Sequence, residues 1–156
     1  MKYEIDMGQS LVTNYLHIVF STKHREALID DVIGNELHNY LVGICKNLEC
    51  QPLKVGGFED HIHILCMLSK KITLVKLMEE LKSHSSKWIK TKGAAYSQFY
   101  WQDGYGAFSV NPSEVDVVIE YISRQKEHHS KKTFHEEYRA FLKKYKVEYD
   151  ERYVWE

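Results

Sequence analysis

Two histidines separated by one residue, His61 and His63, stand at the head of an apolar run with the composition of a strand. In a strand, alternate side chains share a face, so both imidazoles project together while Ile62 and Ile64 point into a core. Two imidazoles held side by side on a stiff element favour a divalent-metal site. Asp60, directly before the pair, could orient one ring or act as a further ligand. The alternative is two half-exposed histidines on a sheet surface, because short motifs often match by chance.

A tyrosine and a glutamine four residues apart, Tyr121 and Gln125, form a second candidate pair. On a helix they would share a face, with their Cβ atoms about 6 Å apart. A helix across the open face of a sheet could aim both at the histidines, and the Gln125 carboxamide oxygen would then be a third ligand for Mg²⁺ or Mn²⁺. A phenol is a weak nucleophile at neutral pH, but a metal that orients a phosphate would allow Tyr121 to attack it. The chain contains eleven tyrosines, so simple packing of Tyr121 on the core stays open here.

The elements that must position these residues follow the order strand, helix, strand, strand, helix, strand. We expect strands over about 11–22, 51–58, 61–68 and 99–110, the last with an irregular middle, and helices over about 31–48 and 73–90. This order is typical of the α+β, ferredoxin-like split βαβ fold (RRM-like), with an antiparallel four-stranded sheet and two helices on one face. The first and third strands are central in that fold. The histidines would therefore lie on the central third strand, on the face that the two helices leave open.

Additional C-terminal helices should follow the sheet. The Asn111-Pro112-Ser113 break predicts a helix start, and the third helix carries Tyr121 and runs to about residue 127. A fourth helix is expected over about 134–145. Residues 1–10 are a polar lead-in, and residues 146–156 have no clear assignment. We expect a single domain over 1–156, with a core of about 11–127 and a C-terminal helix and tail over 128–156.

Composition limits the class of protein. A chain of 156 residues with 44% hydrophobic and 28% charged residues is ordinary for one soluble globular domain. It has no signal-like segment and no apolar run of about 18 residues, so we expect neither export nor membrane insertion. Cys45, Cys50 and Cys66 lack metal-site spacing and predict reduced thiols in a cytoplasmic protein.

The charges are segregated along the chain. The net charge of −1 argues against indiscriminate nucleic-acid binding. Yet residues 70–92 contain seven lysines against two glutamates, and residues 124–146 contain eight basic residues against three acidic ones. Two such clusters are compatible with a phosphate-facing surface, and equally with two solvated helix faces.

Four segments form an ordered set along the chain: 15–23 (YLHIVFSTK), 61–63 (HIH), 101–110 (WQDGYGAFSV) and 121–125 (YISRQ). They resemble, in turn, the first strand, the HUH motif, the segment before the catalytic helix and the YxxxQ element of one family. That family is the single-tyrosine HUH transposases of small bacterial insertion sequences, with their REP-associated tyrosine transposase relatives. The resemblance covers about residues 11–146.

The resemblance implies a DNA transposase that cleaves and rejoins single-stranded DNA at hairpin-flanked element ends. It implies a 5′-phosphotyrosine intermediate on Tyr121 and a divalent metal, Mg²⁺ or Mn²⁺, held by His61, His63 and Gln125. It further implies a homodimer in which the tyrosine helix of one subunit completes the site of the other.

Residues that contact DNA are expected in the two basic clusters: Lys70, Lys71, Lys82, Lys87 and Arg124. His24 and His84 are further histidines that could bind a metal, with surface roles as the alternative. The competing class of function is a domesticated hairpin-DNA-binding or RNA-binding module of the same fold, without transposition activity.

Overall fold

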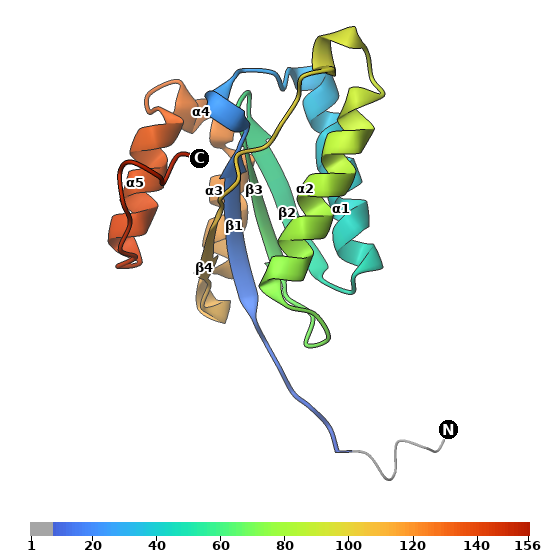
Figure 1. The fold of residues 1–156 in the computed structure, drawn as a ribbon. Helices are drawn as coiled ribbons and strands as arrows, with labels where there is room; N and C mark the ends of the chain where they lie inside the picture. The colour runs from blue at the N-terminus through green and yellow to red at the C-terminus, as the bar shows by residue number, and fades with distance from the viewer. Residues whose placement is uncertain (1–7) are drawn as a thin grey trace.

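The computed structural model describes residues 8–156 and contains one antiparallel sheet with the strand order β2-β3-β1-β4 (Figure 1). The strands are β1 (Tyr15–Ser21), β2 (Gln51–Phe58), β3 (His61–Met67) and β4 (Gly106–Ser109). Helix α1 (Asp31–Asn47) links β1 to β2, and α2 (Leu74–Lys90) links β3 to β4. The predicted α+β, ferredoxin-like fold is confirmed, with β1 and β3 as the central strands. Residues 1–7 of the expected lead-in lie outside the described residues.

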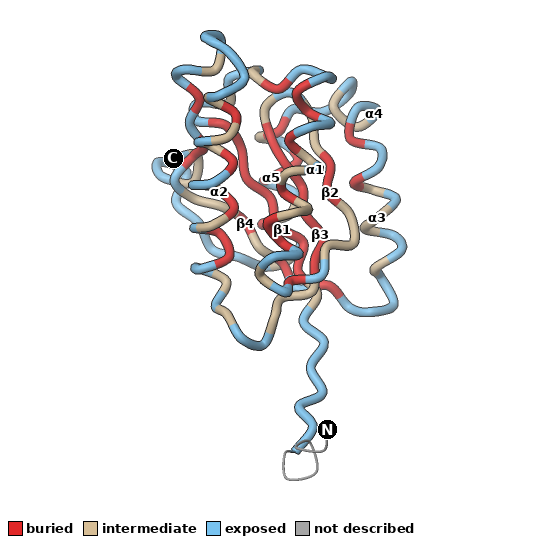
Figure 2. Tube along the Cα trace, turned by 90° about the vertical axis from the view of Figure 1, so that its right-hand side faces the viewer, coloured by how far each residue is buried: buried red, intermediate tan, exposed pale blue. Residues whose placement is uncertain are grey.

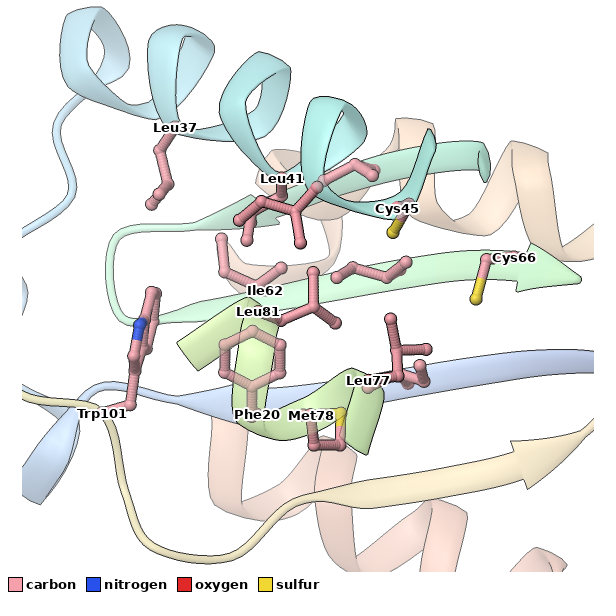
Figure 3. Packing of buried hydrophobic residues seen from close by; sticks show 14 of the residues in the cluster. Phe20, Leu37, Leu41, Cys45, Ile62, Cys66, Leu77, Met78, Leu81 and Trp101 are labelled. Carbon is pink, nitrogen blue, oxygen red and sulfur yellow. The ribbon is translucent and has the colours of Figure 1, made fainter. Parts of the chain in front are cut away.

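The main core fills the space between the sheet and the helices α1 and α2 (Figure 3). Alternate residues of the central strands point into it, among them Phe20 from β1 and Ile62 from β3, both fully buried. Each helix begins at a side-chain cap that accepts a hydrogen bond from a free backbone N–H: Asp30 for α1 at 2.8 Å and Thr73 for α2 at 3.1 Å. Because strand side chains alternate, the residues between these core positions face the other side of the sheet.

The second face of the sheet is covered by C-terminal helices, as Figure 1 shows. They are α3 (Val115–Ser123), α4 (Gln125–His129) and α5 (Phe134–Lys144). Residues 8–156 also contain three short 3₁₀ segments, Lys23–Arg25, Ala94–Tyr96 and Pro112–Glu114. Helix α5 packs on β1 and β4 through a cluster of Val19, Phe108, Phe134, Tyr138 and Leu142. Burial in Figure 2 is accordingly greatest in the strands, which lie between two helical layers.

Two predicted strands, the first and the fourth, differ in extent from the observed ones. The first strand begins at Tyr15, which pairs with the last residue of β3, so Leu11 and Val12 have no strand partner and are 86% and 50% exposed. Within the expected 99–110, Trp101 forms an isolated bridge with Thr22, and β4 itself covers Gly106–Ser109 after an irregular stretch. Before it, the carbonyls of residues 102–104 accept hydrogen bonds from Lys82 Nζ at 2.7–3.0 Å instead of pairing in the sheet.

The third helix is also shorter than predicted. It ends at Ser123, and Arg124 leaves helical geometry with φ −111° and ψ 27° before α4 begins. The expected fourth helix, about 134–145, agrees with α5. The start of α5 is fixed by a capping box between Thr133 and Glu136. Within the described residues, no helix is long and apolar enough to span a membrane.

Candidate active site

The histidine pair lies where the sequence pattern places it. His61 and His63 are fully buried on β3, on the face opposite Ile62 and Ile64, with α3–α5 above them. The tight connection from β2 brings the backbone of Gly57 against the carbonyl of His61, where any Cβ would overlap that carbonyl. A glycine is therefore required beside the first histidine.

His61 is held between two groups. Its Nδ1 lies 2.7 Å from Asp60 Oδ1, and because a carboxylate only accepts, the Nδ1–H donates. On the other side of the ring, Nε2 lies 2.9 Å from Gln125 Oε1. Asp60 thus fixes the ring orientation and leaves Nε2 to point into the site, the arrangement usual for metal-binding histidines.

His63 is held by a residue that the sequence did not single out. His17 on β1 lies two residues before Val19, the residue opposite His63, and its Nε2 is 2.7 Å from His63 Nδ1. Both rings are buried, and burial lowers the pKa of each below the ordinary histidine value. Both imidazoles are therefore neutral at pH 7, the form in which histidine binds metals.

Glu137, in the first turn of α5, stands at the centre of the site with 2% of its surface exposed. Its Oε1 lies 3.1 Å from His63 Nε2, 3.2 Å from His129 Nε2 and 3.5 Å from His61 Nε2. Its Oε2 accepts a hydrogen bond from Gln125 Nε2 at 3.2 Å. Burial opposes the charge of Glu137, but the surrounding imidazoles outweigh burial and hold the pKa below its usual range.

Tyr121 reaches the same carboxylate from α3. Its hydroxyl donates to Glu137 Oε2, and its ring lies 5.8 Å from the ring of His63 in the same chain. The other face of the phenol stacks on His128, with centroids 4.5 Å apart. Burial and the Glu137 carboxylate raise the pKa of Tyr121 above the usual phenol value, so the hydroxyl is protonated at neutral pH.

The structure brings all four predicted site residues together: His61, His63, Tyr121 and Gln125. Three other members, His17, His129 and Glu137, were missed. His129 had a signal in the sequence, since 121, 125 and 129 are each four residues apart, although the predicted third helix ends at about residue 127. Glu137 had none, because its place depends on how α5 folds back.

The predicted DNA contacts have varied surroundings. Lys82 is partly buried and bonded to three carbonyls, which gives it a structural task in this conformation. Lys71 pairs with Glu49, and Arg124 pairs with Glu127 on an exposed surface. Lys70 and Lys87 are exposed. His24 and His84 lie on the surface, away from the buried set, and His84 pairs with Glu80.

The donor set suits a divalent metal. Ligand atoms of His61, His129 and Glu137 lie within 4.8 Å of one another, and His63 and Gln125 adjoin them. Imidazole nitrogens with carboxylate and carboxamide oxygens match the preferences of Mn²⁺ and related ions. The group therefore fits a metal centre.

Solved structures share this fold. One is a crystal structure from Deinococcus radiodurans R1 that carries a transposase assignment, with TM-score 0.59 and 18% identity over 77% of this chain and 97% of that one. Another is a REP-associated tyrosine transposase bound to a REP hairpin, with TM-score 0.58 and 10% identity over 80% of this chain and 73% of that one.

No curated protein matches the chain significantly. The family described as IS200-like transposase matches residues 10–125, about three quarters of the sequence, from before β1 to Gln125. The chain therefore belongs to the IS200-like transposase family.

Proposed function

We propose that this transposase cleaves and rejoins single-stranded DNA through a covalent bond to Tyr121. The Tyr121 hydroxyl gives up its proton as its oxygen attacks a backbone phosphorus and forms a 5′-phosphotyrosine bond. The bond from phosphorus to the 3′ oxygen breaks, and that oxygen takes up a proton and leaves as a hydroxyl. Because the phosphotyrosine bond retains the energy of the phosphodiester, the reverse attack by a 3′-OH rejoins strands without ATP. A divalent metal, Mg²⁺ or Mn²⁺, would supply charge stabilisation at the phosphate when bound.

The metal would be held by His61, His63 and Gln125 in this proposal. The residues of the chain then have separate tasks: Asp60 and His17 orient the two rings, and Gln125 presents its carboxamide oxygen. The surrounding helices bury the set, which strengthens every electrostatic interaction inside it.

The observation that carries the proposal is the position of Tyr121. Its hydroxyl and both histidines contact one carboxylate, Glu137, although they come from separate elements of the chain. A tyrosine that merely packed on the core would not need a buried polar network of this kind.

The substrate we propose is a hairpin in single-stranded DNA at the ends of a mobile element. The family membership supports transposition, and the solved relative bound to a REP hairpin supports the hairpin form. Lys70, Lys71, Lys87 and Arg124 are the proposed phosphate contacts, and Lys82 joins them only if its loop opens.

The test uses labelled single-stranded hairpins taken from around the gene, with Mn²⁺ or Mg²⁺ added. We expect an adduct that survives a denaturing gel in the wild type and in Tyr100→Phe, which changes an exposed tyrosine whose ring lies against Lys90 of α2. Tyr121→Phe should form none, and chelation of the metal should abolish the adduct. An equal adduct in Tyr121→Phe would refute the proposed nucleophile.

A binding module of the same fold is the second candidate. Tight hairpin binding without any adduct, under every metal condition, would favour it. The buried histidines and Gln125 speak for the enzyme, because a binder that stacks bases would present exposed aromatic side chains on its sheet, and here helices cover that face.

The homodimer with shared sites stays a prediction from the family resemblance. One chain already brings Tyr121 beside its own histidine pair, so a partner is not needed to complete the set.

A further inference from the structure

The starting observation is a hydrogen-bonding conflict at His61 Nε2. Since Nδ1–H donates to Asp60, the neutral ring has a bare lone pair on Nε2. That lone pair faces two oxygens, Gln125 Oε1 at 2.9 Å and Glu137 Oε1 at 3.5 Å. Two acceptor oxygens therefore face a third acceptor atom in a buried space.

Turning the Gln125 amide does not resolve the conflict. In the orientation observed, its Nε2 donates to Glu137 Oε2 at 3.2 Å and its oxygen faces His61. With the amide reversed, the nitrogen would donate to His61, but the oxygen would face the carboxylate. Each orientation satisfies one neighbour and leaves two acceptors in contact, which is costly in a buried site.

Glu137 adds a charge to this space. Its partners are imidazoles, Gln125 and Tyr121, and among residues 8–156 no lysine or arginine pairs with it. Burying an ionised carboxylate without a cation is unfavourable. A proton on His61 would satisfy one oxygen, whereas a divalent cation would satisfy all three acceptors and balance the carboxylate.

We propose that Glu137 is itself a ligand of the divalent metal, through Oε1, beside His61 and Gln125. This inference rests on the proposed metal site and extends it to α5. The family match ends at Gln125, so this ligand comes from a segment outside the matched residues. If Glu137 is a ligand, metal binding stabilises the packing of α5 on the sheet. Oε2 of the same carboxylate accepts the hydrogen bond of the Tyr121 hydroxyl.

The test is a calorimetric titration of the full chain with Mn²⁺ alone, without DNA. Glu137→Gln keeps the shape of the side chain and removes its charge, and we expect it to bind Mn²⁺ at least roughly 10- to 100-fold more weakly than the wild type. Glu136→Gln is the matched control, because it removes an exposed charge one residue away and keeps a capping box. It should bind as the wild type does.

Unchanged or tighter Mn²⁺ binding in Glu137→Gln would overturn the inference, and tighter binding would show that the carboxylate only occupies the metal's place. His61→Ala and His63→Ala separate the proposal of a metal site from the proposal that Glu137 is one of its ligands. If both bind Mn²⁺ normally, the proposed metal site itself is wrong. If they lose binding and Glu137→Gln does not, only the role of Glu137 fails.

Hydrogen exchange in the wild-type chain gives a second readout that needs no substitution. Mn²⁺ should slow exchange of the amides of α5 (Phe134–Lys144) several-fold, and those of α1, on the other face of the sheet, should not change. Equal exchange in α5 with and without Mn²⁺ would contradict a ligand on that helix.

Discussion

At the scale of single residues, the site depends on side chains that orient its histidines by hydrogen bonds: Asp60 orients His61, and His17 orients His63. The pattern of alternating residues on β3 sufficed to predict where His61 and His63 point, and the spacing of four predicted the side shared by Tyr121 and Gln125. His17 could not be recognised from the sequence in the same way. Its role comes from the pairing of β1 with β3, which places it beside His63 although 46 residues separate the two.

Replacing His17 tests this positioning role. His17→Ala removes the partner of His63 Nδ1, so we expect Mn²⁺ affinity to fall about 10- to 100-fold while the fold survives. His17→Gln can still accept a hydrogen bond and should recover part of the loss. His84→Ala, which changes an exposed histidine on α2, serves as the control. Equal Mn²⁺ affinity in His17→Ala and the wild type would show that the ring only fills space.

At the scale of elements, the sheet, its first two helices and the bounds of α5 follow from local sequence, whereas the packing of the C-terminal helices over the sheet does not. Caps and hydrophobic spacing mark α1 and α2, and both start where predicted. The break at Arg124 and the return of α5 depend on contacts that form only in the folded chain, such as Phe134, Tyr138 and Leu142 against β1 and β4. The irregular middle of the strand predicted over 99–110 depends on a contact of the same kind, because Lys82 binds the carbonyls before β4.

The close contact between α3 and Gly56 of β2 gives a prediction at this scale. A Cβ on Gly56 would lie 2.8 Å from Ile122 Cγ2 and 3.0 Å from the Ile122 carbonyl, at the end of the helix that carries Tyr121. Gly56→Ala should therefore displace α3 and lower the free energy of unfolding by about 1–3 kcal/mol. Adduct formation should fall as well.

Gly43→Ala is the matched control, since a Cβ there meets nothing within 4 Å and the position is inside α1. It should raise the free energy of unfolding by about 0.5–1 kcal/mol. Urea unfolding of both variants measures the difference. A Gly56→Ala protein as stable as the wild type would mean that α3 does not rest on this strand.

At the scale of the whole molecule, the question is whether one chain supplies a complete site. In the structure, Tyr121 and His63 of the same chain both contact Glu137. The family resemblance predicts instead that subunits exchange the helix that carries the tyrosine. The sequence could not decide this, because the order of the elements is the same in both arrangements.

Mixing two inactive variants distinguishes these arrangements. If one chain is self-sufficient, Tyr121→Phe and His63→Ala together should form no more adduct than either alone. Substantial recovery of cleavage in the mixture would show that tyrosine and metal site come from different subunits.

The most direct test of the account is to locate the covalent bond to DNA. After reaction of the wild type with a hairpin substrate and Mn²⁺, the protein is digested with trypsin and the nucleotide-bearing peptide is sequenced by mass spectrometry. Cleavage after Lys92 and Arg124 gives a peptide with four tyrosines, so fragmentation must assign the site. We predict the 5′-phosphate on Tyr121. A phosphate on any other residue would contradict this prediction.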